Sequence, residues 1–590
     1  MEAGVGPRQE PAQLSPPAAQ AGASRRIPAI KLTLEQATSI AACALLTWLV
    51  LYPLAVLVIG SLRTDLPMRA GRFTPANFLA LFAEPANQEA ILNTFISSGL
   101  ATVLAVIIGM TLAFITSRTD APGRAFFDNA FVLPYYLSPF IGAIAWTLLA
   151  NPRVGFLNSL LTGIFPIEHA PLNIYTLGGL VFVLALYYSP IVFLFGAGAL
   201  RAMDPALEEA ARMNGAGALA TALRVTLPLV TPAVGSAALL VFLNAAGQFG
   251  IPAVIGIPMH YEVITTRIWI GLGYFPPRYG EAAAFAVVLL LVSAMIMFLQ
   301  QRHLARRSFV TVSGRGYRPS VVQLGALRPI AAAACVLYLL VSIVLPYGAL
   351  LFTSFQPYLS FAFEPAQWTL RPYAEVLLNN PLTVRAIRNS LLLATGGATL
   401  TILFALVISH IVTRTRLAAR HAVDILATLP AGVPAVVFAV ALLWSYIFLP
   451  VPIYGTIWML LIAYVSHYIP FGVRAATAGL AQVSSELEES ARIHGAGAFA
   501  TLWRIVIPLI KPALAAGWIL MFVEFIRSLS LSILLYSDDS IVMPVVIYEL
   551  YETGAYPALA AFSVLQTILV FAAILGARKI ARLDSLMQLR

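Results

Sequence analysis

Two stretches of this chain, 280 positions apart, place carboxylates, arginines, glycines and a proline in nearly the same order. Residues 208–230 read EEAARMNGAGALATALRVTLPLV and residues 488–510 read EESARIHGAGAFATLWRIVIPLI, so 13 of the 23 aligned positions are identical. Charged groups among small side chains suit docking against another protein surface through charge-assisted hydrogen bonds. Because the stretch occurs twice, it predicts a partner that contacts the chain at two equivalent places.

Each stretch predicts a compact knob of two short helices. Alanine-rich residues up to Asn214 favour the first helix, Gly215 can adopt the left-handed conformation that ends it, and a second helix over 218–226 leads to Pro228. The alternative is an ordinary amphipathic helix at a membrane surface, but the matched spacing of the two copies favours docking. The predicted docking residues are Glu208, Glu209, Arg212, Gly215, Gly217, Arg224 and Pro228 in the first copy, and Glu488, Glu489, Arg492, Gly495, Gly497, Arg504 and Pro508 in the second.

The rest of the chain predicts a membrane protein. Of its 590 residues 60% are hydrophobic and 11% charged, which leaves too little charge to solvate the surface of a soluble domain. About 20 apolar residues cross a bilayer core. The apolar runs predict an all-α polytopic protein with twelve spans, near 37–61, 91–116, 127–150, 174–199, 229–256, 282–301, 329–354, 387–413, 422–449, 453–478, 510–536 and 557–580.

The twelve spans form two copies of one six-span unit. Asn93 aligns with Asn389, and Pro134 with Pro430, at an offset of 296, whereas the knobs align at 280. The first half therefore holds 16 extra residues, which we expect in the external loop around 151–173. An even number of spans gives parallel repeats, related by an axis along the membrane normal. The predicted organisation is a flexible tail (1–36), a first repeat (37–301) with its knob loop (201–228), a basic linker (302–328), a second repeat (329–582) with its knob loop (481–508), and a short tail (583–590).

The distribution of basic residues predicts the orientation. With the N-terminus in the cytoplasm, 26 of the 36 Lys and Arg residues lie inside and 9 outside, as the positive-inside rule requires. Both termini, the linker and both knobs are then cytoplasmic, and the chain is a multi-pass protein of the inner (plasma) membrane. The net charge of +10 is thus a topology signal and does not indicate a nucleic-acid partner.

No residues suited to catalysis or to metal binding come together in the sequence. A phosphate-binding loop needs glycines followed by Lys-Ser or Lys-Thr, and none of Lys31, Lys511 and Lys579 is followed by Ser or Thr. Two cysteines, Cys43 and Cys335, and seven scattered histidines are interpreted as structural. We therefore expect a chain that is not an enzyme and that binds neither a metal nor a cofactor.

Polar side chains recur at the same depth of the fifth and eleventh spans. Glu524 and Arg527 are spaced to pair on one helix face. At the offset of 280, Asn244 aligns with Glu524 and Gln248 with Ser528. Charges at bilayer depth usually face a cavity or a partner, so these five residues are predicted to line a translocation path. The alternative is a buried ion pair that only fixes helix packing.

The two knob sequences resemble a motif of a known family. The first knob, with Glu209-Ala210-Ala211, Gly215 and a Leu-Pro at 227–228, is similar to the EAA motif of the membrane subunits of bacterial type I ABC importers. The second knob departs mildly from the motif, with Ser490 for Ala and Ile507 for Leu. The resemblance implies the type I permease fold, in which this loop docks into a groove of a cytoplasmic ATPase. It also implies that Glu209 and Glu489 are the principal polar contacts.

The resemblance also implies the partners. These are two copies of an ABC ATPase, which use ATP and Mg, a periplasmic or extracellular solute-binding protein, and membrane lipid. One chain carries both halves, as in the fused permeases of the ferric-iron type, so no second permease chain is needed. Residues 173–190 and 261–269 also resemble that subgroup. Ferric iron is the first expected substrate, and polyamine, phosphonate or sulfate are the alternatives.

A second class of function also fits part of the sequence. A secondary transporter driven by an ion gradient would also have six plus six spans and charges within the membrane. It would not explain two matching docking knobs. Copurification with a nucleotide-binding subunit would separate the two classes.

Overall fold

The computed structural model describes residues 34–64, 72–166, 169–305, 321–361, 364–415, 419–447 and 449–587. Most of the predicted N-terminal tail and of the linker, and the last three residues, lie outside these ranges. Within them the chain is helical, and its only β structure is two isolated bridges. Ten of the described helices are long and apolar enough to cross a membrane, or twelve if each of two bent helix pairs is one span. This confirms the predicted fold class.

The first half begins with α1 (Leu34–Leu46), which runs through the π-helical turn η1 (Thr47–Leu51) into α2 (Tyr52–Ser61). Its other long helices are α4 (Pro85–Arg118), α9 (Leu177–Ala202), α12 (Leu227–Ala246) and α14 (Tyr279–Ala305). Between them lie α3 (Ala76–Ala83), α5 (Arg124–Ala130), α6 (Leu133–Tyr136), α7 (Pro139–Ala150), α8 (Phe156–Ile164) and α13 (Ile264–Gly273).

The second half repeats this order. It begins with α15 (Arg328–Leu339), η6 (Leu340–Val344) and α16 (Leu345–Ser354), followed by α18 (Pro381–Leu392), η9 (Leu393–Gly397) and α19 (Ala398–Arg414) as one long span. The bent pair is α20 (Arg420–Thr428) with η10 (Leu429–Gly432) and α21 (Ala435–Tyr446). Then come α22 (Ile457–Leu480), α25 (Ile507–Arg527), α26 (Leu529–Ser532), α27 (Met543–Glu552) and α28 (Tyr556–Met587).

The third span of each half is broken at prolines. The chain bends by 95° between Tyr136 and Pro139 and by 113° between Gly432 and Ala435. Pro139 and Pro434 sit at these bends. Proline lacks the N–H that an uninterrupted helix needs and clashes with the preceding turn, so it favours a break. Each break places polar backbone within the bundle, where it is tolerated only beside protein or a cavity.

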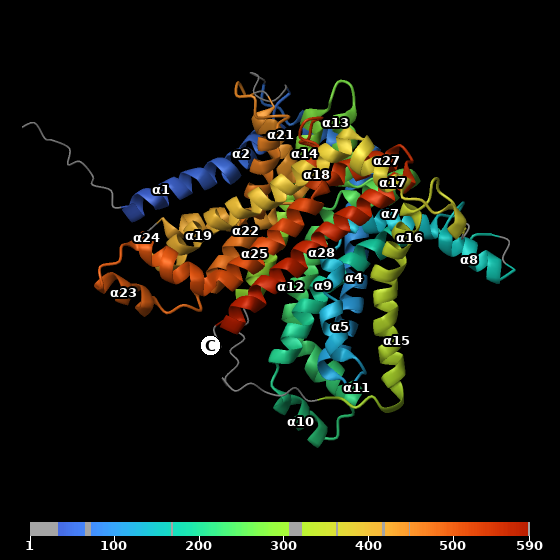
Figure 1. Cartoon of the computed structure of the whole chain (residues 1–590), viewed down its shortest axis with the longest axis horizontal. Coiled ribbons are helices and arrows are strands. Elements are labelled where there is room, and N and C mark those ends of the chain that lie inside the picture. The colour runs from blue at the N-terminus through green and yellow to red at the C-terminus, as the bar shows by residue number, and fades with distance from the viewer. Residues whose placement is uncertain are drawn as a thin grey trace, which may run out of the picture.

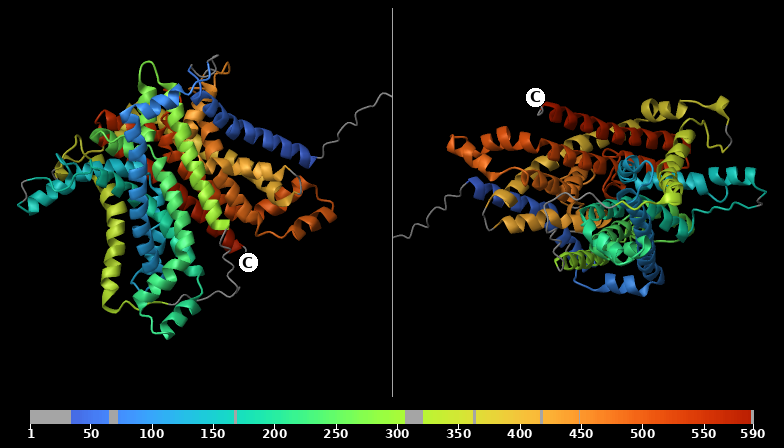
Figure 2. Two further views of the ribbon diagram at one scale, coloured as in Figure 1. Left: turned by 180° about the vertical axis from the view of Figure 1, so that it is seen from behind. Right: turned by 90° about the horizontal axis from the view of Figure 1, so that it is seen from below.

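The first span of each half crosses over to the other half. Helix α2 packs against α21 of the second half as well as α14 of its own, and α16 packs against α7 of the first half as well as α28. The contact of α2 with α21 is close, since a Cβ atom at Gly60 would lie 2.6 Å from Cε3 of Trp444. The two halves are therefore intertwined, although Figures 1 and 2 show the long helices of the second half, such as α19 and α25, tilted away from α9 and α12 of the first.

The two halves differ in the connection between their third and fourth spans. Helix α7 ends at Ala150 and α9 begins at Leu177, whereas α21 ends at Tyr446 and α22 already begins at Ile457. The extra residues of the first half lie in this connection, which contains α8 and extends sideways from the bundle in Figure 1.

The predicted spans 229–256 and 510–536 begin and end earlier than expected, since the helices that could cross the membrane run over Ala222–Ala246 and Leu502–Arg527. Gly247, just beyond the end of α12, packs against Pro434, whose Cβ would lie 2.8 Å from an added Cβ atom. A side chain at position 247 would therefore collide with the break in α20–α21, so the glycine lets the end of α12 approach the other half closely.

Candidate functional site

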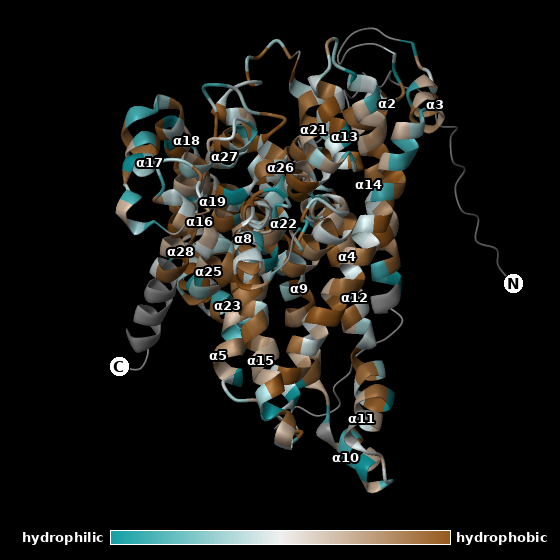
Figure 3. Ribbon diagram, turned by 90° about the vertical axis from the view of Figure 1, so that its right-hand side faces the viewer, coloured by the Kyte–Doolittle hydropathy of each residue, from teal (hydrophilic) through white to brown (hydrophobic). Residues whose placement is uncertain are grey.

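The first knob consists of α10 (Pro205–Met213) and α11 (Ala218–Thr221). The carboxylate of Asp204 caps α10 by accepting a hydrogen bond from the Ala206 N–H at 2.9 Å. Gly215 has φ +82°, a left-handed conformation that glycine adopts without strain. Helix α10 lies beyond the ends of the long helices, on the side away from α13 (Figure 1). It is hydrophilic, whereas the long helices above it are largely apolar (Figure 3).

The second knob has the same local structure. Helix α23 (Ser485–Ile493) is followed by Gly495 at φ +83° and by α24 (Ala498–Thr501). In both knobs the predicted second helix is not separate. Helix α11 continues through the π-helical turn η2 (Ala222–Thr226) into α12, and α24 continues through η11 (Leu502–Val506) into α25. Each knob is thus joined to a span without a flexible connection.

Glu208 does not lie on the surface of the first knob but is buried beneath it. Its Oε2 atom is 3.4 Å from Nη1 of Arg118, the last residue of α4, and both side chains are almost fully buried. Its Oε1 atom accepts a hydrogen bond from the Thr226 hydroxyl at 2.7 Å. Glu208 therefore attaches α10 both to α4 and to the turn that leads into α12.

Glu488 makes the corresponding contact in the second half. Its Oε1 atom is 3.0 Å from Nε of Arg414, the last residue of α19. Arg414 Nη2 also donates to the carbonyl oxygens of Leu480 and Val483, at 3.0 and 2.6 Å. Position 506, which aligns with Thr226, is a valine, so the second carboxylate lacks the hydroxyl donor of the first.

The other predicted docking residues are at the surface. In the first knob the exposed residues are Glu209, Arg212, Gly215, Gly217, Arg224 and Pro228, and in the second they are Glu489, Gly495, Gly497, Arg504 and Pro508. The side chain of Arg492 lies outside the part of the chain that the structure describes. In each knob the two adjacent glutamates thus differ, since the first is held inside the protein and the second faces outward.

Arg118 and Arg414 were missed by the sequence reasoning. Arg118 lies 90 residues before Glu208, and Arg414 lies 74 residues before Glu488. Both are at the end of a span, where the positive-inside rule already accounts for an arginine. The signal was nevertheless present, because the two arginines align with each other at the same offset of 296 as Asn93 and Asn389.

A cavity of about 600 Å³ lies between the two halves. Its walls come from the break between α6 and α7, from α9 and α12 in the first half, and from η10, α21, α22 and α25 in the second. All five polar residues predicted for the translocation path line it, namely Asn244, Gln248, Glu524, Arg527 and Ser528. The structure therefore brings together residues from the C-terminal ends of α12 and α25.

Glu524 and Arg527 pair as their spacing predicts. Arg527 Nε donates to Glu524 Oε2 at 3.2 Å, and Nη2 contacts Oε1. Arg527 Nη1 also donates to the carbonyl oxygens of Tyr135 and Leu137, the latter at 3.0 Å. These carbonyls belong to the break in the third span of the other half. The pair is therefore more than an intrahelical contact, because it joins α25 to the opposite half across the cavity.

Two tyrosines of the cavity were also missed. The Tyr188 hydroxyl donates to the Asn244 carbonyl at 3.3 Å, and the Tyr468 hydroxyl donates to Ser528 Oγ at 3.3 Å. Both tyrosines align at the knob offset of 280 and lie two residues before a proline inside a span. His467, which the sequence reasoning took as structural, also lies on the cavity wall.

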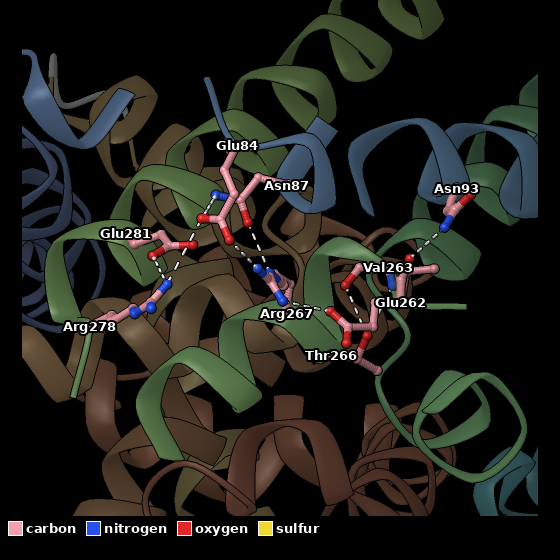
Figure 4. A network of polar contacts seen from close by, with 9 residues as sticks. All are labelled: Glu84, Asn87, Asn93, Glu262, Val263, Thr266, Arg267, Arg278 and Glu281. Carbon is pink, nitrogen blue, oxygen red and sulfur yellow. Dashed lines mark hydrogen bonds and ion pairs between the residues drawn. The ribbon is translucent and has the colours of Figure 1, made fainter. Parts of the chain in front are cut away.

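At the end of the bundle opposite α10, a polar network fixes α13 to α4 (Figures 1 and 4). Arg267 donates to Asn87 Oδ1 at 2.9 Å, to Glu84 Oε1 at 3.1 Å and to Glu262 Oε2 at 3.0 Å. Asn93 donates to the Glu262 carbonyl at 3.0 Å. Glu262 and Arg267 belong to the 261–269 segment noted above, and the structure gives them this packing role.

The equivalent asparagine acts similarly in the second half. Asn389 donates to the carbonyl oxygens of Asp539 and Ile541 at 2.9 and 3.0 Å, before α27 begins. The next residues also correspond, since Thr94 Oγ1 accepts from the Ile264 N–H and Ser390 Oγ from the Met543 N–H. The repeat thus extends to individual hydrogen bonds.

Comparison with known proteins agrees with this geometry. Residues 90–310 and 397–582 each match the family described as "Binding-protein-dependent transport system inner membrane component", and together they make up more than half of the chain. The chain belongs to this family. It is the permease of an ABC importer, with two family domains fused in one polypeptide.

The relatives of the permease include two ferric transport proteins. It is 28% identical to the "Ferric transport system permease protein FbpB" of Actinobacillus pleuropneumoniae, over 85% of this chain and 72% of the relative. It is 29% identical to "Putative ferric transport system permease protein FbpB 1" of Haemophilus influenzae, over 79% and 73%. It is also 26% identical to the "Spermidine/putrescine transport system permease protein PotC" of Escherichia coli, over 35% of this chain and 78% of the relative.

Proposed function

We propose that this permease couples ATP hydrolysis by two ATPase subunits to the import of a small cationic solute, with ferric iron as the first candidate. One observation carries the proposal. The helices that begin in the two knobs, α12 and α25, end with the polar residues of the cavity. A displacement of either knob by an ATPase is therefore transmitted along a continuous helix to the cavity wall.

In this proposal both knobs and both chain termini face the cytoplasm. Glu209 and Glu489 contact the ATPase subunits, which bind the ATP and Mg, while Glu208 and Glu488 hold each knob in position. A solute-binding protein delivers substrate at the opposite face, near α13 and α27. Closure of the ATPase pair shifts the balance between two arrangements of the halves and so exposes the cavity to one side and then the other. The chain itself carries no cofactor.

The chemistry of the cavity supports a cation as substrate. Phenol, amide and hydroxyl oxygens line it, and hard cations prefer oxygen ligands. Two of the relatives described above are named for ferric iron and one for spermidine and putrescine, which are also cations. Phosphonate and sulfate, the anionic alternatives, have less support because Arg527 is already engaged by Glu524 and by backbone carbonyls.

Uptake by the reconstituted complex tests this proposal. The permease is purified with its ATPase, placed in proteoliposomes with its solute-binding protein, and supplied with ferric iron, spermidine or sulfate. We expect ATP-dependent uptake of iron that vanadate abolishes and a proton ionophore does not. Uptake that stops with the ionophore while ATP remains would favour a secondary transporter, and uptake of spermidine alone would replace iron by a polyamine.

The role of the cavity is tested by Glu524→Ala, which leaves Arg527 without its counter-ion. We expect uptake to fall by about tenfold or more, because Arg527 then presents an unneutralised positive charge to a cationic solute in the cavity. Copurification of the ATPase should be unchanged, since the knobs are remote from the cavity. Leu400→Ala, at an exposed position of α19, is the control. Normal uptake by the Glu524→Ala permease at normal abundance would reduce the pair to a packing contact.

A further inference from the structure

The end of the linker contacts the chain beside the first knob. Residues 306–320 lie outside the described ranges, but Val322 forms a parallel β-bridge with Thr119, directly after α4. The Val322 N–H donates to the Arg118 carbonyl at 2.8 Å, and the Asp120 N–H donates to the Val322 carbonyl at 3.3 Å. This is the same Arg118 whose guanidinium group pairs with Glu208.

The backbone bond has a physical reason. The last carbonyl groups of a helix lack partners within the helix, and a buried one must find a partner elsewhere. Arg118 is almost completely buried, and Val322 supplies the donor for its carbonyl oxygen. Arg118 thus holds the knob through its side chain and the linker through its backbone.

Asp120 extends this contact to the seventh span. Its Oδ1 atom accepts from the Leu324 N–H at 2.9 Å, and its Oδ2 atom is 2.9 Å from Nη2 of Arg328. Leu324 directly precedes the helical segment of η5 (Gly325–Leu327) and α15, so the carboxylate lies at the N-terminus of the seventh span. A negative charge there is favoured by the helix dipole.

The carboxylate occurs in one half only. At the offset of 296, Arg118, Thr119 and Arg124 align with Arg414, Thr415 and Arg420, but Asp120 aligns with Arg416. An arginine cannot accept hydrogen bonds from a helix N-terminus. The Asp120 contact is therefore a feature of the first half, where the linker enters the second half.

We propose that Asp120, together with the pairing of Val322 with Thr119, is a brace that ties the first ATPase-docking knob to the seventh span. This rests on the proposed function of the knob. A displacement of α10 then reaches α15 through Arg118 and, two residues further, Asp120, in addition to its route along α12. The linker of the fused permease is thereby a part of the coupling machinery and not only a tether, and Asp120 is a positioning residue.

The contact itself is tested without ATPase or substrate. Val322→Cys is introduced after replacement of Cys43 and Cys335, and the rate of labelling by a water-soluble maleimide is measured in nanodiscs. Asp120→Ala should raise this rate about fivefold, because the loss of hydrogen bonds to the Asp120 carboxylate destabilises the state in which Val322 is paired with Thr119. Gln323→Cys, at an exposed position, is the control and should not change. An unchanged rate at position 322 would overturn the brace.

The coupling role is tested with the complete complex, as solute imported per ATP hydrolysed. We expect Asp120→Ala to lower this ratio about threefold or more and Asp120→Asn, which keeps one acceptor oxygen, to have a smaller effect. Asp128→Asn, which removes a surface partner of Arg201, is the matched control. A normal ratio for Asp120→Ala would refute the coupling role. Absence of ATP-driven uptake in the wild type would instead refute the proposed function, and the labelling result would stand independently.

Discussion

Removal of Glu208 and of Glu488 should have unequal effects, although the two residues are equivalent in the repeat. In Glu208→Ala, Arg118 loses its counter-ion. Its side chain is 1% exposed, and its Nε and Nη2 atoms have no hydrogen-bond partner among the described residues. A buried charge left without a partner costs about 3–5 kcal/mol.

In Glu488→Ala the remaining arginine is better supported. Arg414 is 16% exposed and keeps the carbonyl oxygens of Leu480 and Val483 as acceptors. The Nε–Oε1 contact that is lost is an ion pair without hydrogen-bond geometry at a partly exposed arginine, so its loss is taken as no more than that of a hydrogen bond to a charged group, about 1.5–3 kcal/mol. The two substitutions should therefore differ by about 2 kcal/mol, which corresponds to a factor of roughly 30 in a local opening equilibrium.

Amide hydrogen exchange of the purified permease in nanodiscs measures this difference. We expect Glu208→Ala to accelerate exchange in residues 205–226 about 30 times more than Glu488→Ala accelerates it in residues 485–506. The double substitution Glu208→Leu with Arg118→Leu should restore much of the protection, because an apolar pair of similar volume replaces a buried ion pair at little cost. Equal acceleration in the two knobs, or a larger effect of Glu488→Ala, would refute the reasoning.

Three further predictions concern single positions. Gly215→Ala, at φ +82°, should destabilise the first knob by about 1–2 kcal/mol in the same exchange measurement, whereas Gly217→Ala, which has open space around it and no positive φ, should not. Glu209→Arg and Glu489→Arg, each at an exposed position, should weaken ATPase binding in a pull-down titration and leave the amide-exchange protection of the knob unchanged. Normal ATPase binding by these variants would contradict the docking role. Asn389→Ala removes two hydrogen bonds that the side-chain amide donates, whereas Asn93→Ala removes one. Asn389→Ala should therefore lower the melting temperature of the permease more. The reverse order of melting temperatures would contradict this.

Much of the fold was predictable because it depends on local properties of the sequence. Long apolar runs predict spans from a simple transfer argument, and Gly215 and Gly495 mark the turns of the knobs. The pairing of Glu524 with Arg527 follows from helix periodicity alone. These features require knowledge of only a few neighbouring residues, and the structure agrees with each of them.

The parts that were missed depend on contacts between distant segments. Arg118 is 90 positions from Glu208, and nothing in the local sequence distinguishes it from other arginines at the ends of spans. From the sequence, Pro139 and Pro434 indicate only kinks. The angle of a bend depends on which hydrogen-bond partners the freed backbone groups find. Here some of them meet Arg527, which comes from the other half of the chain. Comparison of the two repeats, position by position, is the sequence signal that reaches such contacts.

The contacts of Arg527 constrain how the cavity can open. Its guanidinium group is bound on one side by Glu524 of its own helix and on the other by carbonyl oxygens of the opposite half. A separation of the halves at this level must break the second set, and each hydrogen bond to a charged group contributes about 1.5–3 kcal/mol. Because Glu524 moves with Arg527, the charge stays neutralised while the halves part. The pair thus permits repeated opening without exposing an isolated charge in the membrane, which an arginine bound only across the interface would not.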